Sequence, residues 1–441
     1  MKAIHVRPRA RRALALITAL VATLAVAPSI ARQGASPPAS DSRARARVLT
    51  PVANDPAGTE RVIVYRGVTD QFLLALNAAV GSSLVYRYEI IQGAAVAVPK
   101  DRVPAAIAFA LARGLKAERD MEIHADLANS ARTVHVKANG QDTGAWGLGY
   151  NGSGVTIAVI DSGIYKEHTS LDDLDDNTGT TDPKVVKFKD YVNNGGGGAE
   201  VPAYDDHDHG SHVSGIAAGT GGGTANIGMA FRSNLAGFKV FSSNGTGSSS
   251  SFIASLNWIL QNPNAVTPRI RVANYSGGSI PVGGNNNGNS AQSLAIDNAS
   301  DAGLVVAAAG GNGSQDGLGP NLIDGNVNIP ADARKAIAVC SSNSANPPTA
   351  PTYSNWDSEG PTGDGRIKPD VCAPGDSVTS VNSPANGGAT GGGPTSYAAF
   401  GGTSMSTPHV AGIVALMIQA VPTLTPAQVR EVLYETARDY P

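Results

Sequence analysis

The 441-residue chain has only two cysteines, Cys340 and Cys372, so it can form one disulfide at most. A disulfide suits an exported protein, and two buried thiols without a bond are the alternative, because bonding depends on a separation that the sequence does not give. Aromatic residues are also scarce, at 5% of the chain, whereas glycine is abundant, with 52 residues. This composition favours tight loops and the packing of small residues over long helices.

Positive charge is scarce in the C-terminal part. Up to Leu127 the chain has 17 Lys and Arg against 10 Asp and Glu, and after it 16 against 26. An acidic C-terminal part argues against nucleic acid as a partner. Hydrophobic residues make up 41%, as in globular proteins, which excludes general disorder.

Long apolar runs are absent after residue 27, so no later segment is expected to cross a membrane. The single long run, ALALITALVATLAVA (13–27), follows a basic start, and small residues Ser29 and Ala31 come after it. This pattern predicts a signal peptide over 1–31 and a secreted, extracellular or periplasmic protein. A membrane anchor is the alternative, but the run is shorter than the ~20 residues that a span needs.

The remaining chain divides by composition into three parts. Residues 32–59 are rich in Ala, Pro, Ser and Arg without periodicity, which predicts a disordered spacer. Residues 60–127 contain strand-like and helix-like stretches that predict a small α+β domain: ERVIVYRG (60–67), TDQFLLALNAAV (69–80), VYRYEIIQGAAVAVP (85–99) and PAAIAFALARG (104–114).

The third part, residues 128–441, repeats short apolar runs that end in glycine-rich loops. They are GVTIAVIDSG (154–163), NLAGFKVF (234–241), IRVANYSGG (270–278), GLVVAAAGG (303–311), KAIAVC (335–340) and PDVCAPG (369–375). Near-continuous apolar strands between helices predict a parallel sheet that is buried on both faces. Functional loops gather at the carboxyl ends of such strands.

Three polar residues occupy places of this kind. Asp161 ends the run VTIAVI, His209 opens the helix-like HGSHVSGIAAG, and Ser404 lies at the start of a long apolar helix. Pro408 fits that helix if it lies in the first turn, where the missing N–H costs little. A serine that attacks, a histidine that carries its proton and an aspartate that orients the histidine are what amide hydrolysis needs.

The segments DSGI (161–164), HGSHVSG (209–215) and GTSMSTPHVAG (402–412), in this order, resemble the three motifs of the subtilisin-like serine proteases, the subtilase family or peptidase S8. The order Asp, His, Ser is an established property of that family. The resemblance covers about 145–440. It implies a subtilisin-like three-layer α/β fold with a mainly parallel central sheet. It also implies a secreted serine endopeptidase that works through an acyl-enzyme intermediate.

Residues 60–127 resemble, less specifically, the inhibitor I9-type propeptide of these enzymes, a chaperone and inhibitor of the 128–441 peptidase domain. The resemblance therefore implies a zymogen that processes itself near Leu127–Thr133. Its expected partners are polypeptide substrates and its own propeptide, with no nucleic acid and no membrane, and the protein is expected to be a monomer.

The resemblance assigns Asp161 as the orienting carboxylate, His209 as the general base and Ser404 as the nucleophile. Asn312 is the expected second oxyanion donor, although one extra glycine precedes it in AAAGGNG (307–313). A turn residue in a Gly-Asn-Gly loop is the alternative for Asn312.

The segment NYSGG (274–278) resembles the strand on which family substrates pair. The predicted substrate-binding residues are Ser276, Gly277, Gly278, Ala308 and Gly310. Gly277 stands where the family often has a larger apolar residue, which opens the neighbouring subsite.

The resemblance implies that no cofactor is required, but members of the family often bind structural calcium. Ser170 and Gly222 replace the usual carboxylate and asparagine of the family's tight site, so that site is expected to be absent and no metal ligand is assigned. The run LDDLDD (171–176) offers carboxylates for calcium elsewhere, and a solvated acidic loop is the alternative.

The spacing of His207, His209 and His212 also permits a zinc hydrolase, a different class of enzyme. HDHGSH has Ser211 where a metallo-β-lactamase-like box has an aspartate, and this interpretation leaves the Ser404 motif unexplained. A catalytically impaired relative that binds peptides without cutting them is the second alternative.

Overall fold

The computed structural model describes residues 48–52, 55–120, 122–125, 136, 144–177, 179–180, 182–193, 197–224, 226–313, 325–342, 353–354, 356–385 and 392–437. The predicted signal peptide, most of the predicted spacer and the expected processing region lie outside these residues. None of the helices in these ranges is long and apolar enough to span a membrane.

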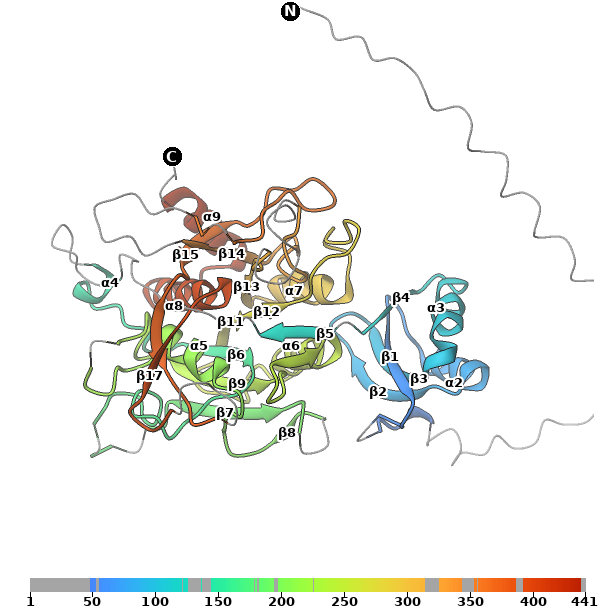
Figure 1. Ribbon diagram of the computed structural model, residues 1–441, viewed down its shortest axis with the longest axis horizontal. Helices are drawn as coiled ribbons and strands as arrows, with labels where there is room; N and C mark the ends of the chain where they lie inside the picture. The colour runs from blue at the N-terminus through green and yellow to red at the C-terminus, as the bar shows by residue number, and fades with distance from the viewer. Residues whose placement is uncertain are drawn as a thin grey trace, which may run out of the picture. The chain divides into compact units, whose positions relative to one another are not determined.

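A central sheet of eight strands organises the described part of the chain (Figure 1). In spatial order the strands are β15 (Val371–Pro374), β14 (Ile337–Ser342), β13 (Val305–Ala309), β11 (Ile270–Tyr275), β6 (Thr156–Asp161), β9 (Asn234–Lys239), β7 (Val185–Asp190) and β8 (Ala199–Glu200). Neighbours are parallel except β7 and β8. The predicted mainly parallel sheet is therefore confirmed.

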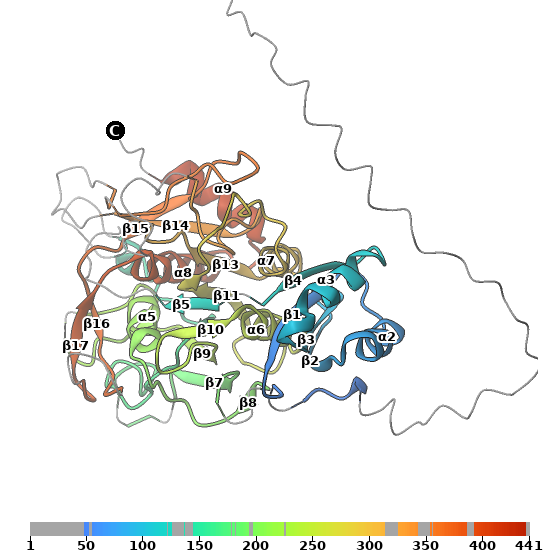
Figure 2. The same cartoon turned by 45° about the vertical axis from the view of Figure 1, so that its right-hand side comes forward.

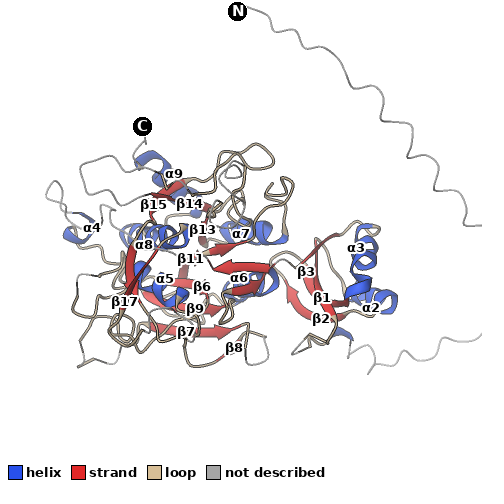
Figure 3. Ribbon diagram, viewed as in Figure 1, coloured by secondary structure: helices blue, strands red, loops and turns tan. Residues whose placement is uncertain are grey.

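Alternate residues of each strand enter two different hydrophobic cores, which makes the fold three-layered. Ile157 and Val159 of β6 pack with helices α5 (His209–Ala218) and α8 (Thr403–Ala420). Ala158 and Ile160 pack with α6 (Ser249–Gln261) and α7 (Ala291–Asp301) on the opposite face. Figure 3 shows these helices around the red strands. Smaller elements complete this region: α4 (Gly144–Gly147), the antiparallel pair β16 (Val378–Val381) and β17 (Tyr397–Phe400), and α9 (Pro426–Thr436).

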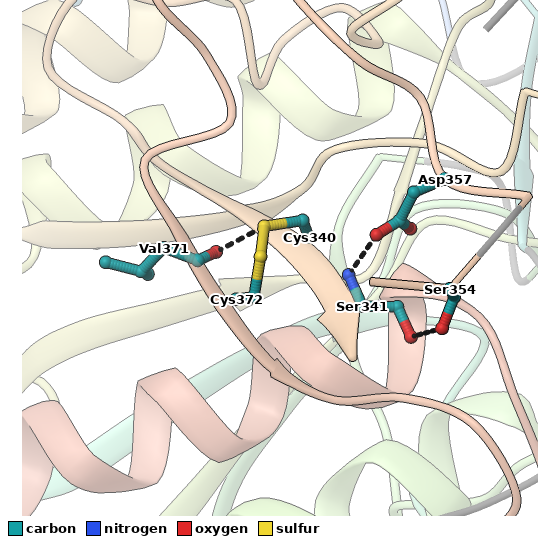
Figure 4. Close-up of a disulfide and its surroundings, with 6 residues drawn as sticks. All are labelled: Cys340, Ser341, Ser354, Asp357, Val371 and Cys372. Atoms are coloured by element: carbon teal, nitrogen blue, oxygen red, sulfur yellow. Dashed lines mark hydrogen bonds between the residues drawn. A yellow bond between two sulfur atoms is a disulfide. The ribbon is translucent and has the colours of Figure 1, made fainter. Parts of the chain in front are cut away.

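The two cysteines form a disulfide, which decides between the two alternatives. Cys340 of β14 and Cys372 of β15 are directly opposite in register, with Cα atoms 4.3 Å apart (Figure 4). In the same figure the backbone N–H of Ser341 donates to Asp357 Oδ2 at 2.6 Å. The disulfide thus ties an edge strand, β15, to the interior of the sheet.

The N-terminal region forms its own four-stranded antiparallel sheet with two helices on one face (Figure 1). Its elements are β1 (Thr59–Tyr65), α2 (Asp70–Val80), β2 (Ser83–Tyr88), β3 (Gly93–Pro99), the 3₁₀ turn η1 (Lys100–Arg102), α3 (Val103–Leu111) and β4 (Lys116–Arg119). Val62 and Val64 of β1 pack with Leu76 and Ala106 under the helices. The predicted α+β architecture therefore holds for these residues.

Two details of this region differ from the prediction. The stretch 85–99 is not one strand but parts of β2 and β3, which reverse direction before Gly93, with Gln92 at φ 47. The predicted spacer is ordered near its end, because Leu49 packs against the core of this domain and the Val52 N–H donates to Leu84 O at 2.8 Å. These contacts with the sheet hold residues 49–52 against this domain.

After β4 the chain continues into strand β5 (Glu122–Ala125), which pairs with segments more than a hundred residues away. β5 lies between β10 (Thr246–Ser248) and β12 (Gly277–Gly278) and is antiparallel to both. Figure 2 labels β5 and β10, and Figure 1 labels β5 and β12. Ala125 is opposite Gly277, and His124 is opposite Gly278. The N-terminal region thus supplies the middle strand of a three-stranded sheet.

Candidate active site

The carboxyl end of β6 and the first residue of α5 bring Asp161 and His209 together. His209 Nδ1 lies 2.7 Å from Asp161 Oδ1, and neither side chain is exposed. This approach requires glycines, because a Cβ on Gly210 would lie 2.2 Å from the Gly163 carbonyl oxygen. The sequence DSG…HG therefore allows the helix to start against the end of the strand.

Asp205 organises the loop that leads into α5. Its Oδ1 accepts from Ser162 Oγ at 3.0 Å and from the N–H groups of His207 and Asp208 at 3.0 and 3.2 Å. Its Oδ2 accepts from the Ser211 N–H and Oγ at 2.8 and 2.6 Å. Burial opposes ionisation of Asp205, but the hydrogen bonds from Ser211 and His207 outweigh it and lower the pKa. Asp205 was not among the predicted site residues, although a carboxylate four positions before His209 was a visible signal.

Ser404 is the second residue of α8. Its Oγ donates to the carbonyl oxygen of Ser276 at 3.1 Å, and its own carbonyl accepts from Ser276 Oγ at 2.7 Å. The expectation that Pro408 lies in the first helical turn was wrong, since α8 begins at Thr403. Pro408 has no N–H for the Ser404 carbonyl four residues earlier, and the Ser276 hydroxyl replaces that donor.

The Asn312 side chain is 1% exposed and contacts the start of α8. Its Oδ1 accepts from the N–H and Oγ1 of Thr403 at 2.9 and 3.0 Å. The extra glycine, Gly311, adopts φ 114, and a Cβ there would lie 2.7 Å from the side chains of Asn328 and Ser358. These contacts place Asn312 beside the residue that precedes Ser404.

The predicted substrate-binding residues fall into two groups. Gly277 and Gly278 form β12, the strand that pairs with β5, and Ser276 connects β12 to β11. Ala308 is a fully buried residue of β13, and the Gly310 N–H donates to Val339 O at 2.9 Å. The first group forms the strand edge paired with β5, whereas Ala308 lies in an interior strand of the central sheet and Gly310 directly follows that strand.

The three histidines of the zinc alternative have separate surroundings. His212 Nε2 lies 3.1 Å from Ala398 O, and its ring stacks on Phe400 at 4.2 Å between centroids. Burial lowers the pKa of His212 to about 3. The described residues contain no group of three or more His, Cys, Asp or Glu side chains that could hold a metal ion. This arrangement does not favour a zinc centre at His207, His209 and His212.

Tyr397 joins Ser170, one of the positions compared with the family's calcium site, to the residue before the other position, Gly222. Ser170 Oγ and Tyr397 Oη are 2.6 Å apart, and Tyr397 Oη donates to Gly221 O, next to Gly222, at 2.7 Å. In the 171–176 run, Asp173 Oδ1 accepts from the Asp175 N–H at 2.7 Å. Asp175 Oδ2 lies 2.9 Å from Arg232 Nη1. Asp173 therefore binds the loop's own backbone, and Asp175 pairs with a cation outside the loop.

Comparison with known proteins decides the family. The subtilase family, Peptidase S8, matches residues 152–441. This chain belongs to the subtilase family.

Two relatives and one solved structure show the extent of the similarity. This subtilase is 31% identical over 327 residues to Serine protease AprX of Bacillus subtilis (strain 168), covering 71% of this chain and 66% of AprX. It is 35% identical over 294 residues to Subtilisin of Bacillus pumilus, covering 66% and 86%. Fervidolysin from Fervidobacterium pennivorans, a keratinolytic enzyme related to subtilisin, shares the fold. Its TM-score is 0.65 at 20% identity, covering 88% of this chain and 59% of fervidolysin. The chain thus spans less than two thirds of AprX and of fervidolysin.

Proposed function

We propose that this chain hydrolyses peptide bonds with Ser404 as nucleophile, His209 as general base and Asp161 as the carboxylate that orients His209. The observation that carries the proposal is the 2.7 Å contact between His209 Nδ1 and Asp161 Oδ1. It lies at the end of β6, whose parallel neighbour β11 is followed by Ser276, the residue that contacts Ser404. A carboxylate on Nδ1 leaves Nε2 as the basic nitrogen and stabilises the imidazolium.

In this mechanism His209 takes the Ser404 proton as the oxygen attacks the substrate carbonyl. The same proton then goes to the leaving amine, which gives an acyl-enzyme. Water then attacks the acyl-enzyme, with His209 again as the base, and the carboxylic acid product is released from Ser404. The hydrogen bond from Ser404 Oγ to Ser276 O must break for the attack.

The negative charge of the tetrahedral intermediate is proposed to lie between two donors. One is the backbone N–H of Ser404, which lies at the N-terminus of α8, where the helix dipole adds a favourable potential. The other is the Asn312 carboxamide, whose Oδ1 is engaged by Thr403, so that its N–H groups remain for the oxyanion.

The substrate is proposed to be a polypeptide that binds as an added strand on β12, as β5 does in this structure. Main-chain hydrogen bonds would supply the affinity. Ser276, Gly277 and Gly278 supply the strand edge, and the other two predicted residues, Ala308 and Gly310, lie in and directly after β13. Gly277 has no side chain to narrow the subsite next to it.

We further propose that the N-terminal domain is an I9-type propeptide that inhibits and assists folding, and that the 128–441 domain releases it by autoprocessing. Support comes from two carboxylates that meet helix N-termini. Glu118 Oε1 accepts from the Ala291 N–H at the start of α7 at 2.8 Å, and Asp120 Oδ1 accepts from the Ser250 N–H near the start of α6 at 2.9 Å. The helix dipole and these hydrogen bonds favour a carboxylate at such positions, whereas burial opposes its charge and raises the pKa of both groups. The fold-assisting role is expected because parallel sheets form many non-local contacts.

Export is proposed from the sequence of residues 1–31, which places the mature enzyme outside the cell or in the periplasm. The protein is expected to act as a monomer on polypeptides, without a nucleic acid or membrane partner. No cofactor is needed by the mechanism, since His209 accepts the proton of Ser404 and later that of water, and gives it to the leaving amine and then back to Ser404.

The proposal is tested by comparing the parent protein with Ser404→Ala. The parent should cleave casein, lose activity to a serine-directed phosphonofluoridate but not to a zinc chelator, and release its N-terminal domain. Ser404→Ala should neither cleave casein nor release the domain. Casein turnover by Ser404→Ala would refute the nucleophile, and normal release of the N-terminal domain by this variant would refute autoprocessing. A parent that binds peptides without cleaving them would instead support the impaired relative.

A further inference from the structure

Asp208, immediately before His209, has an unusual backbone and an inward-facing carboxylate. Its φ of 86° and ψ of −29° are left-handed, a conformation that aspartate and asparagine adopt more readily than most residues with a Cβ. Asp208 occupies the N-cap position of α5, yet its side chain makes no capping hydrogen bond. The residue is only 4% exposed. Helix capping therefore does not explain this residue.

The carboxylate of Asp208 has the His207 ring as its neighbour. Asp208 Oδ1 and His207 Nδ1 are 3.8 Å apart, and both atoms are buried without a hydrogen-bond partner among the described residues. The His207 ring in turn lies edge-to-face with the His209 ring, with centroids 6.3 Å apart. Asp208, His207 and His209 thus form a series of neighbouring groups.

The other charged groups nearby already have partners. Asp205 accepts five hydrogen bonds from residues 162–211. Lys239 Nζ, at the end of β9, binds Asp206 Oδ1 at 2.5 Å and the carbonyl oxygens of Ser162 and Phe241. Asp161, at the end of β6, accepts from His209.

The loop before β10 covers the far side of the His207 ring. A Cβ on Gly245 would lie 2.7 Å from His207 Nε2, so only glycine permits this approach. Gly245 brings no charge, and the ring is held between the loop and His209. His207 therefore has a fixed orientation, with Nδ1 toward Asp208.

We propose that the Asp208 carboxylate, acting through the His207 ring, stabilises the imidazolium form of His209 during catalysis. This makes Asp208 and His207 positioning residues, and it rests on the proposed role of His209 as general base. Asp161 holds His209 by a hydrogen bond, whereas Asp208 acts by charge in a site where screening is weak. His207 transmits the effect as a polarisable ring between the two groups, because the charge of Asp208, 3.8 Å from His207 Nδ1, polarises the ring beside His209.

The protonation states agree with this role. Burial, together with the nearby charge of Asp205, raises the pKa of Asp208 to about 6. Burial, together with the charge on His209, lowers the pKa of His207. At neutral pH Asp208 is therefore ionised and His207 is neutral, which is the arrangement that the proposal needs.

The test is the pH profile of kcat/KM for Asp208→Asn, which removes the charge and keeps the left-handed backbone accessible. Without this carboxylate the imidazolium is less stable, so the acid limb should move to lower pH by about half a unit or more. The plateau should fall about two- to tenfold. Asp208→Gly, which also suits a positive φ, should shift the limb in the same direction. Asp301→Asn, an equal charge change at the exposed C-terminal residue of α7, should leave the limb in place.

His207→Phe tests whether the His207 ring transmits the effect of the Asp208 charge to His209, because phenylalanine keeps a ring but lacks the two nitrogens. The shift caused by Asp208→Asn should be smaller in the His207→Phe background than in the parent. An Asp208→Asn profile that superimposes on that of the parent would overturn the proposal, and equal shifts in both backgrounds would overturn the part played by His207.

A second readout needs no activity. In Ser404→Ala protein with labelled histidine, NMR titration should show a lower pKa for His209 when Asp208→Asn is added, and an unchanged value would also overturn the proposal. Failure of the proposed function is distinguishable, since it would appear as casein turnover by Ser404→Ala.

Discussion

At the scale of single residues, the site depends on side chains that hold backbone groups in place. Asn312 binds the N–H that starts α8, and Ser276 binds the carbonyl that Pro408 leaves without its helical donor. Both contacts are made to residues 403–404. The nucleophile is thereby fixed from both sides by hydrogen bonds to its backbone neighbourhood.

Asn312→Ala should lower kcat about 10²–10³-fold with little change in KM, because an oxyanion donor acts mainly in the transition state. A subtilisin that loses its oxyanion asparagine shows a loss of this size, and the family relationship extends that expectation to Asn312. Steady-state kinetics on a chromogenic peptide would measure it. Asn262→Ala, which removes a side-chain hydrogen bond to Trp258 O at the end of α6, is the control and should leave kcat unchanged. An Asn312→Ala variant with the parent's kcat would remove Asn312 from the oxyanion site.

Ser276→Ala should destabilise the protein by about 1–3 kcal/mol, because the buried Ser404 carbonyl loses its donor. It should also lower kcat, since that carbonyl belongs to the nucleophile. Chemical denaturation and kinetics would measure the two effects. Ser255→Ala is the matched control: this buried serine donates to Phe252 O within its own helix, so kcat should be retained. Equal kcat values for the two variants would contradict the positioning role of Ser276.

At the scale of secondary structure, the N-terminal domain meets the catalytic sheet through the N-termini of α6 and α7. Glu118 lies in β4 and Asp120 directly follows this strand, two positions later. Their side chains therefore point to the same side, and each carboxylate reaches the N-terminus of one helix. Burial raises the pKa of Glu118 to about 7 and also raises that of Asp120. This contact is therefore expected to respond to pH.

The docked state binds the Glu118 proton more tightly than the undocked state does. The contribution of Glu118 is therefore full below its ordinary value of 4.5 and is lost as pH rises through about 7. Thermal midpoints of full-length Ser404→Ala protein at pH 5 and pH 8 would measure this loss. Adding Glu118→Gln should reduce the pH difference, whereas Glu60→Gln, on a half-exposed carboxylate paired with Arg119, should not. An unchanged difference with Glu118→Gln would refute the prediction.

Some elements were predictable from sequence because their signal is local. The buried strands β6, β9, β11 and β13 are near-continuous apolar runs, and the glycine and serine residues around Asp161, His209 and Ser404 carry specific motifs. β4 and β5 were not predicted, because KAER and EIHA are short and partly polar and become strands only by pairing. The Ser276 and Thr403 contacts at the site were not predictable either, since they join residues 91–128 positions apart.

At the scale of the whole molecule, the sheet edge formed by β15 is secured covalently. The disulfide joins cysteines 32 positions apart in the sequence. In the unfolded chain this bond restricts a loop of that size, which corresponds to roughly 3–4 kcal/mol of stabilisation. The C-terminal helices follow β15, so the edge strand also influences how α8 is anchored.

Replacing both cysteines by alanine in the Ser404→Ala background should lower the free energy of unfolding by roughly 3–4 kcal/mol. Reducing the disulfide of the Ser404→Ala protein that keeps both cysteines should lower the free energy of unfolding by a similar amount. Denaturant titration, with and without reductant, would measure both, and the double variant should not respond to reductant. A background protein that unfolds at the same denaturant concentration after full reduction would contradict the prediction.

The three-stranded sheet of β10, β5 and β12 has a consequence for what the enzyme can accept. β5 is hydrogen-bonded along both of its edges, so a segment that replaces it must also have two free edges. A strand already paired in a folded protein has at most one. Loops, tails and unfolded chains satisfy this condition, so the accessibility of a target's backbone, as much as its side chains, should decide which bonds are cut.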